Sequence, residues 1–334
     1  MSAKTSNKWK DSLLKTSLPL EYLVADKLDK KGFFVAGEFS FTRRNEQGID
    51  TEFSVDLRAS NLLEKPRSHD YWANLNLLIE CKYNHPAVKW IFAPHPENSV
   101  VITGVINVFQ DLCTRRISKE DELYRLDSDL DFCVKGIELH ETDANPQSIT
   151  RGLHQIRWAI PQLTAEMFRE QANTNHDGDL HIGFLCPIVV TNAPLYVFRR
   201  GLSLHKFQTA SKLEDVADKV EALVVYQERG PQLNEYLRNI ITNLNTTTPN
   251  INERLNSLWH IIRTPKERKY LHSTWDFDQT IDSISVRVLV VTLDAFDRVI
   301  SKIQSSVTKS GRTLKRVASL NLEEGKSKAV IEPL

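Results

Sequence analysis

The stretch NLNLLIECKY, residues 74–83, constrains the fold most strongly. Its apolar run is typical of a buried β-strand bounded by less regular sequence. The run nevertheless ends in Glu80 and Lys82, which stand two residues apart on either side of Cys81. Burying two opposite charges is unfavourable unless they pair with each other or hold something. We therefore expect a buried strand whose end carries a functional site.

The sequence before this stretch predicts a helix and two strands. Ser17 and Pro19 indicate the start of a helix that ends near Gly32. Two strand-like segments follow, FFVAGEFSFTR and IDTEFSVDLRA, with a turn at 45–48 between them, and residues 60–73 read as an irregular excursion. The second segment and NLNLLIECKY are expected to form antiparallel strands joined by a long loop.

Beyond this region the pattern alternates between strands and helices. Apolar runs at SVVITGVINVF and DFCVKGIEL precede a helical periodicity over 148–172, which Pro161 should kink or divide. HIGFLCPIVVTNAPLYVF indicates two short buried strands. From residue 206 the chain is helix-rich, with one strand, SISVRVLVVTL, followed by the helix DAFDRVISKIQSS. The predicted fold class is α/β, with a mixed central sheet flanked by helices and a helix-rich C-terminal extension.

Length and composition leave the function open. The 334 residues suffice for one elaborated domain or two, and 43 basic residues balance 43 acidic ones, so net charge neither points to a nucleic-acid partner nor excludes one. The sequence has no signal-peptide core and no apolar run of the roughly 18 residues a membrane helix needs. We expect a cytoplasmic protein without membrane contact, whose four scattered cysteines are reduced thiols.

Strand alternation places the charged side chains on particular faces. Glu80 and Lys82 share one face of their strand, and Asp56 lies opposite the apolar face that Val55 and Leu57 form on the preceding strand. If the strands pair, Asp56 lies beside Glu80, and two carboxylates that close repel each other without a cation. We expect bound Mg2+ or Mn2+, with Lys82 orienting or deprotonating water or stabilising charge on a phosphate oxygen.

One more acid is expected near this pair. Glu21 falls in line with Val24, Ala25 and Leu28, on the helix face that should pack inward.

Together the helix acid, V-D-L in one strand and I-E-C-K in the next resemble the PD-(D/E)xK phosphodiesterase superfamily over about residues 15–200. The resemblance implies metal-dependent cleavage of a nucleic-acid backbone. Asp56 and Glu80 would bind the metal, the Cys81 carbonyl would be a further ligand, Lys82 would be the catalytic lysine and Glu21 the acid of the first helix.

The resemblance also implies a supporting residue and a domain layout. Gln155 matches the glutamine that some branches carry after the core strands, although the tyrosine of their fuller motif is replaced by Trp158 or Ala159. The implied layout is a restriction endonuclease-like core over 1–205, a helix-rich accessory region with one strand over 206–308, and a flexible tail over 309–334.

Several alternatives stay open at the sequence level. Asp50 follows the Q-G-I turn and has the same parity as Asp56, but the two lie roughly 20 Å apart along a strand and cannot share one ion. A calcium-loop pattern is formed by Asp127, Asp129, Asp131 and Glu138, and a possible transition-metal cluster by His176, Asp177, Asp179 and His181. Four basic clusters could bind phosphates: Arg43 and Arg44, Arg115 and Arg116, Arg199 and Arg200, and 264–269.

The sequence therefore predicts a Mg2+- or Mn2+-dependent deoxyribonuclease, with DNA as partner. By analogy it would act in restriction or antiphage defence, as a homodimer or as a subunit of a defence complex. One alternative is a DNA-binding or scaffold subunit that keeps the nuclease fold without turnover. Another is a metal-independent hydrolase with paired carboxylates, such as a glycosidase.

Overall fold

The computed structural model describes residues 8–14, 16–44, 47–63, 71–96, 130–140, 144–145, 147–174, 180–262 and 286–309. The helices are α1 (Lys8–Leu14), α2 (Leu18–Lys30), α4 (Gln147–Thr174), α5 (Leu204–Thr209), α6 (Pro231–Thr247), α7 (Ile251–Ile262) and a C-terminal helix over 293–309, with a 3-10 turn η1 (Leu213–Asp215). The strands are β1 (Phe34–Arg44), β2 (Asp50–Leu62), β3 (Tyr71–Lys82), β4 (Lys89–Pro94), β5 (Asp131–Leu139), β6 (Ala144–Asn145), β7 (Leu180–Thr191), β8 (Leu195–Phe198), β9 (Ala217–Val220), β10 (Ala222–Gln227) and β11 (Val286–Thr292).

The described strands form one mixed sheet. Its order is β1-β2-β3-β7-β11-β10-β5-β4-β8-β9, and β6 pairs with β5 outside this path. β2 is antiparallel to β3, as the sequence predicts, and β3 runs parallel to β7 along its whole length. Residues 74–81 of β3 are buried apart from the half-buried Asn74, which confirms the strand expected from the apolar run. The predicted fold class, a mixed sheet flanked by helices, is confirmed.

The C-terminal third contributes directly to this sheet. β11 lies between β7 and β10, parallel to the first and antiparallel to the second, and all its residues from Val288 to Val291 are fully buried. Residues 206–308 therefore supply three described strands, β9, β10 and β11, and the expectation of one strand is wrong. The expected boundary at residue 205 does not separate two sheets, because strands distant in sequence pair across it.

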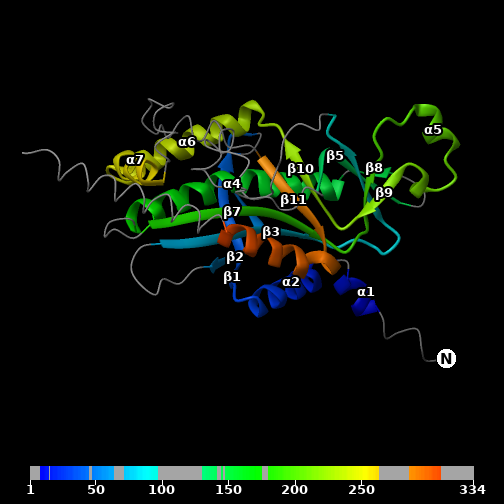
Figure 1. Cartoon of the computed structure of the whole chain (residues 1–334), viewed down its shortest axis with the longest axis horizontal. Coiled ribbons are helices and arrows are strands. Elements are labelled where there is room, and N and C mark those ends of the chain that lie inside the picture. The colour runs from blue at the N-terminus through cyan, green and yellow to red at the C-terminus, as the bar shows by residue number, and fades with distance from the viewer. Residues whose placement is uncertain are drawn as a thin grey trace, which may run out of the picture.

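Helices cover both faces of the sheet (Figure 1). Helix α4, with α6 packed against it, lies on one side, and α2 with the C-terminal helix lies on the other. Helix α4 runs unbroken for 28 residues through Pro161, so the predicted division of this helix is wrong. Its first turn is held by the buried Glu138, whose carboxylate accepts hydrogen bonds from the Ile149 N–H at 3.0 Å and the Ser148 hydroxyl at 3.0 Å.

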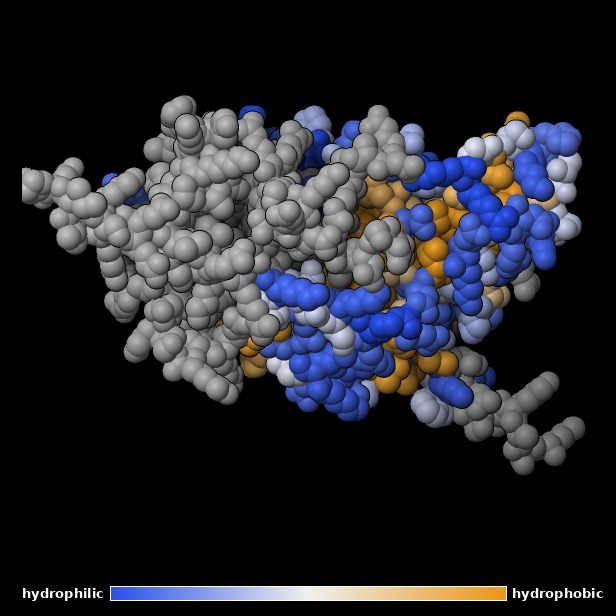
Figure 2. All heavy atoms as spheres, viewed as in Figure 1, coloured by the Kyte–Doolittle hydropathy of each residue, from blue (hydrophilic) through white to orange (hydrophobic). Residues whose placement is uncertain are grey.

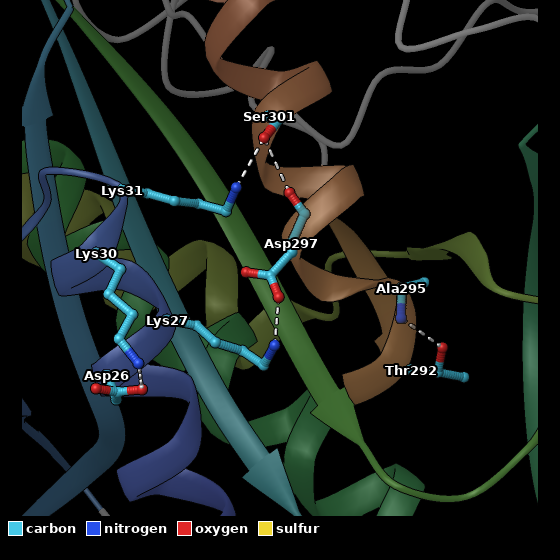
Figure 3. Close-up of polar contacts among 8 residues, drawn as sticks. All are labelled: Asp26, Lys27, Lys30, Lys31, Thr292, Ala295, Asp297 and Ser301. Atoms are coloured by element: carbon cyan, nitrogen blue, oxygen red, sulfur yellow. Dashed lines mark hydrogen bonds and ion pairs between the residues drawn. The ribbon is translucent and has the colours of Figure 1, made fainter.

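The C-terminal helix is tied to α2 by polar contacts at the surface (Figure 3). Lys27 donates to Asp297, and Lys31 Nζ donates to Ser301 Oγ at 2.8 Å. Figure 2 shows hydrophilic side chains over these two helices on the face in view. Underneath, Leu20, Val24 and Leu28 of α2 are buried in the main core, as the amphipathic pattern predicts. Within the described ranges, no helix has the length and apolar character needed to cross a membrane.

Candidate active site

The candidate site lies where β2 and β3 part. The two strands pair from Leu62 with Asn74 as far as Leu57 with Ile79, and beyond that point β2 pairs with β1 alone. The β1–β2 ladder has a bulge at the same place. Between two neighbouring paired positions, β2 contains two residues, Asp56 and Leu57, whereas β1 contains only Glu38. Such a bulge redirects side chains and is frequent beside active sites. It frees Asp56 from regular pairing.

Asp56 bridges the opening between the strands. The Cys81 N–H, which a continued ladder would bond to the β2 backbone, donates instead to Asp56 Oδ2 at 2.7 Å. Because the N–H and C=O of one strand residue point to the same side, the Cys81 carbonyl also faces this opening. The Cys81 side chain points away and is fully buried. Burial raises the pKa of Asp56, an effect that the Cys81 N–H and Lys82 oppose and that Glu38 reinforces.

Glu80 is a buried acid with a strongly raised pKa. Its side chain is 0% exposed, and Oε1 accepts a hydrogen bond from Lys82 Nζ. Oε2 is buried and has no hydrogen-bond partner in the part of the chain that the structure describes. Burial, and next the charge of Asp56, raise the pKa of Glu80 to about 7 against the pull of Lys82. The carboxylate is therefore poised to gain or lose a proton near neutral pH.

Lys82 and Gln155 connect three elements around the two acids. Besides Glu80, Lys82 Nζ contacts Gln155 Oε1 at 3.2 Å, and its side chain is 19% exposed. Gln155 Nε2 in turn donates to the backbone carbonyl of Ser54 at 3.2 Å. Through these bonds α4 spans from the end of β3 to β2 on the far side of the opening. The structure thus brings Gln155 into contact with Lys82.

Glu21 reaches the site from α2, on the other side of the sheet. Burial raises the pKa of Glu21, the charge of Asp56 raises it further, and the charge of Lys82 lowers it. Glu21 therefore lies within electrostatic range of Asp56 and Lys82. The acidic group is completed by Glu38, which raises the pKa of Asp56 and of Glu21. Glu38 was missed by sequence reasoning because it is exposed and sits at the β-bulge, which strand alternation does not reveal.

Gly152 is a second residue whose role only the structure shows. The sequence places it on the inward face of α4, and a Cβ added there would lie 3.1 Å from Lys82 Cε and 3.5 Å from Glu80 Cγ. Glycine in a helix interior costs stability relative to alanine, so its presence needs a packing reason. Here it lets α4 approach close enough for the lysine to lie between the helix and β3.

Asparagine side chains hold the strand ends just beyond Lys82. Asn84 Nδ2 donates to the Lys82 carbonyl and to Thr191 Oγ1, both at 3.1 Å, so β3 and β7 are joined where the register ends. Asn192 exchanges hydrogen bonds with the Asn84 backbone at 2.7 and 2.8 Å. This network fixes the backbone that carries Lys82.

The structure separates the other candidates from this group. Asp50 is the first residue of β2, and its side chain is 69% exposed and pairs with Arg44 at 3.5 Å. Glu138 is occupied by the first turn of α4, and Arg199 pairs with Asp218 at 2.7 Å. Candidate positions outside the described residues are Arg115, Arg116, Asp127, Asp129, His176, Asp177, Asp179, 264–269 and the tail from 310.

The assembled donors suit a hard divalent cation. The charge of Asp56 raises the proton affinity of Glu80, and one oxygen of Glu80 is buried without a hydrogen-bond partner among the described residues. Mg2+ is commonly held by one or two carboxylates with water completing its shell. Among the described side chains, no group of three or more His, Cys, Asp or Glu is arranged to hold a metal ion. Comparisons with protein families, curated proteins and solved structures find no match.

Proposed function

We propose that this protein is a metal-dependent phosphodiesterase that cleaves the backbone of a nucleic acid. One observation carries the proposal: Asp56 and Glu80 converge at the parting of β2 and β3, with Lys82 bonded to Glu80 and one Glu80 oxygen left buried without a partner. A purely structural salt bridge between Glu80 and Lys82 would not include Asp56, because the charge of Asp56 raises the pKa of Glu80 and so weakens the ion pair.

The cation would be Mg2+ or Mn2+, held by the carboxylates of Asp56 and Glu80 and by the Cys81 carbonyl, which faces the same opening. When bound, such an ion supplies positive charge to a phosphate and lowers the pKa of water. The protein must first release the Glu80 proton, because cation ligands bind in their deprotonated form. Glu80, with a pKa of about 7, does so at neutral pH and above.

The remaining residues orient groups and supply charge. Lys82 is the cationic donor closest to the carboxylates, and its ammonium can stabilise the charge that develops on a phosphate oxygen. Gln155 holds that ammonium at 3.2 Å and anchors it to the β2 backbone. Glu21 adds a further negative charge beside Asp56 and Lys82 from α2, which favours a bound cation.

The proposal is tested by cleavage of linear and plasmid DNA with Mg2+ or Mn2+. Asp56→Asn and Lys82→Ala should each abolish cleavage while the far-UV circular dichroism spectrum stays unchanged, and EDTA should abolish it in the wild type. Asp218→Asn is the matched control, because Asp218 is an exposed aspartate on β9, at the opposite edge of the sheet from β1. Cleavage that survives Asp56→Asn or EDTA contradicts the proposal, and binding of DNA without any cleavage would favour a nuclease-fold scaffold instead.

A further inference from the structure

A large polar groove, here named the α6 groove, opens beside the candidate site. It has a volume of about 1340 Å³, above the roughly 300–1,000 Å³ typical of small-molecule pockets. Three elements form its walls: the end of β1 with the hairpin tip, the outer face of α4 and one face of α6.

The groove begins next to the catalytic group. Ser40, which lines it, is the register partner of Ser54, and the Ser54 carbonyl accepts the hydrogen bond from Gln155. On α4, His154 lines the groove and its chain neighbour Gln155 contacts Lys82. A polymer lying in the groove therefore runs toward the opening between β2 and β3.

The lining of the groove is rich in amides and balanced in charge. Two arginines, Arg43 and Arg44, are matched by Asp50 and Glu235, and Arg44 pairs with Asp50. On α6 the exposed side chains of Gln232, Asn239 and Asn243 recur at helical spacing along one face. Such a lining is poorly suited to a phosphate backbone alone, whose binding depends on excess positive charge. Amides offer a donor and an acceptor together, as the edges of unpaired bases require.

An aromatic group at the groove wall adds a surface for stacking. The ring of His154 lines the groove and stands edge-on to Trp158, whose Nε1–H donates to His154 Nε2 at 2.9 Å. This bond leaves the proton of the neutral imidazole on Nδ1. Burial, with the nearby arginines Arg43 and Arg157, lowers the pKa of His154 and favours that neutral form. Trp158 itself is 5% exposed, so it supports the histidine and fills the core.

We propose that the α6 groove binds an unpaired strand of nucleic acid, with Asn239 and Asn243 contacting base edges and His154 stacking on a base. The inference rests on the proposed function and assigns its substrate as a nucleic acid with a single-stranded segment. The strand enters over α6, passes His154 and reaches the phosphodiesterase site beside Gln155. Tyr236 braces this wall, because its hydroxyl donates to the Thr42 carbonyl at 3.0 Å and joins α6 to β1.

The test measures binding of the full-length protein to labelled single-stranded and duplex oligonucleotides in EDTA, by fluorescence anisotropy. The double variant Asn239→Ala/Asn243→Ala should bind the single strand at least roughly tenfold more weakly, because it loses two amide contacts to base edges. Asn245→Ala is the matched control: it is an exposed asparagine on the same helix that does not line the groove. Alanine favours the helix over asparagine, so all three substitutions should preserve folding.

The outcomes separate this inference from the function it rests on. Unchanged binding by the double variant, an equal loss in Asn245→Ala, or a duplex that binds as tightly as the single strand would overturn the inference. Unchanged binding by the double variant would favour an extended polypeptide as the occupant of the groove. Metal-dependent cleavage that Asp56→Asn abolishes would then still support the phosphodiesterase. Conversely, groove-dependent binding with no cleavage under any metal would sustain the groove and refute the enzyme.

Discussion

Replacing Glu80 by glutamine should stabilise the fold at alkaline pH while destroying activity. Burial and Asp56 raise the pKa of Glu80 from 4.5 to about 7, so the folded state holds this proton more tightly than the unfolded chain does. The stabilisation from protonation is complete below pH 4.5 and is lost as pH rises through 7. At roughly 1.4 kcal/mol per pKa unit, the ionised carboxylate at pH 8 destabilises the wild type by about 3 kcal/mol.

Glu80→Gln keeps the shape of the side chain and removes the titration. The free energy of unfolding of the variant, relative to wild type, should therefore be near zero at pH 4.5 and rise toward about 3 kcal/mol at pH 8. Lys82 loses a charged partner but keeps Gln155 and some contact with water, since it is 19% exposed. Urea unfolding in EDTA at several pH values, followed by tryptophan fluorescence, measures this difference.

Glu166→Gln provides the matched control for this experiment. Glu166 pairs with Arg58 at 2.8 Å, with a side chain 31% exposed, so its loss should destabilise by about 1 kcal/mol or less with no gain above pH 7. Adding Mg2+ at pH 7.5 should stabilise the wild type and leave Glu80→Gln unchanged. If Glu80→Gln proves less stable than wild type at pH 8, the Glu80–Lys82 pair is net stabilising and the argument from burial fails.

Two further substitutions probe how the helices support the site. Gly152→Ala should lower the cleavage rate at least roughly tenfold, because the new Cβ lies 3.1 Å from Lys82 Cε. The thermal stability should stay equal or rise, because alanine has the higher helix propensity. An unchanged rate in a steady-state cleavage assay would contradict this prediction. Asp297→Asn removes the ion pair between Asp297, whose side chain is 46% exposed, and Lys27, whose side chain is 30% exposed. The variant should lose about 1 kcal/mol or less of unfolding free energy in urea. A loss of cleavage would show that the C-terminal helix positions α2 for activity.

Local patterns predict much of the candidate site. The alternation of side chains along β3 places Glu80 and Lys82 on one face, and the structure shows both side chains in contact. The apolar neighbours Val55 and Leu57 favour Asp56 over Asp50 as a buried acid, and the structure places Asp56 at the parting with the Cys81 N–H bound to it. Glu38 and Gly152 could not be assigned to the site in this way, since one depends on a bulge and the other on how closely α4 approaches β3.

The sequence by itself determined strands such as β2 and β3, amphipathic helices such as α2, and the faces on which their charges lie, because these follow from repeats of about two and 3.6 residues along the chain. Only the tertiary structure decided that β11 enters the sheet between β7 and β10, and that α6 and the β1–β2 hairpin enclose a groove beside the site. Pairing between strands far apart in sequence depends on complementary surfaces across the whole fold, and no local repeat records that.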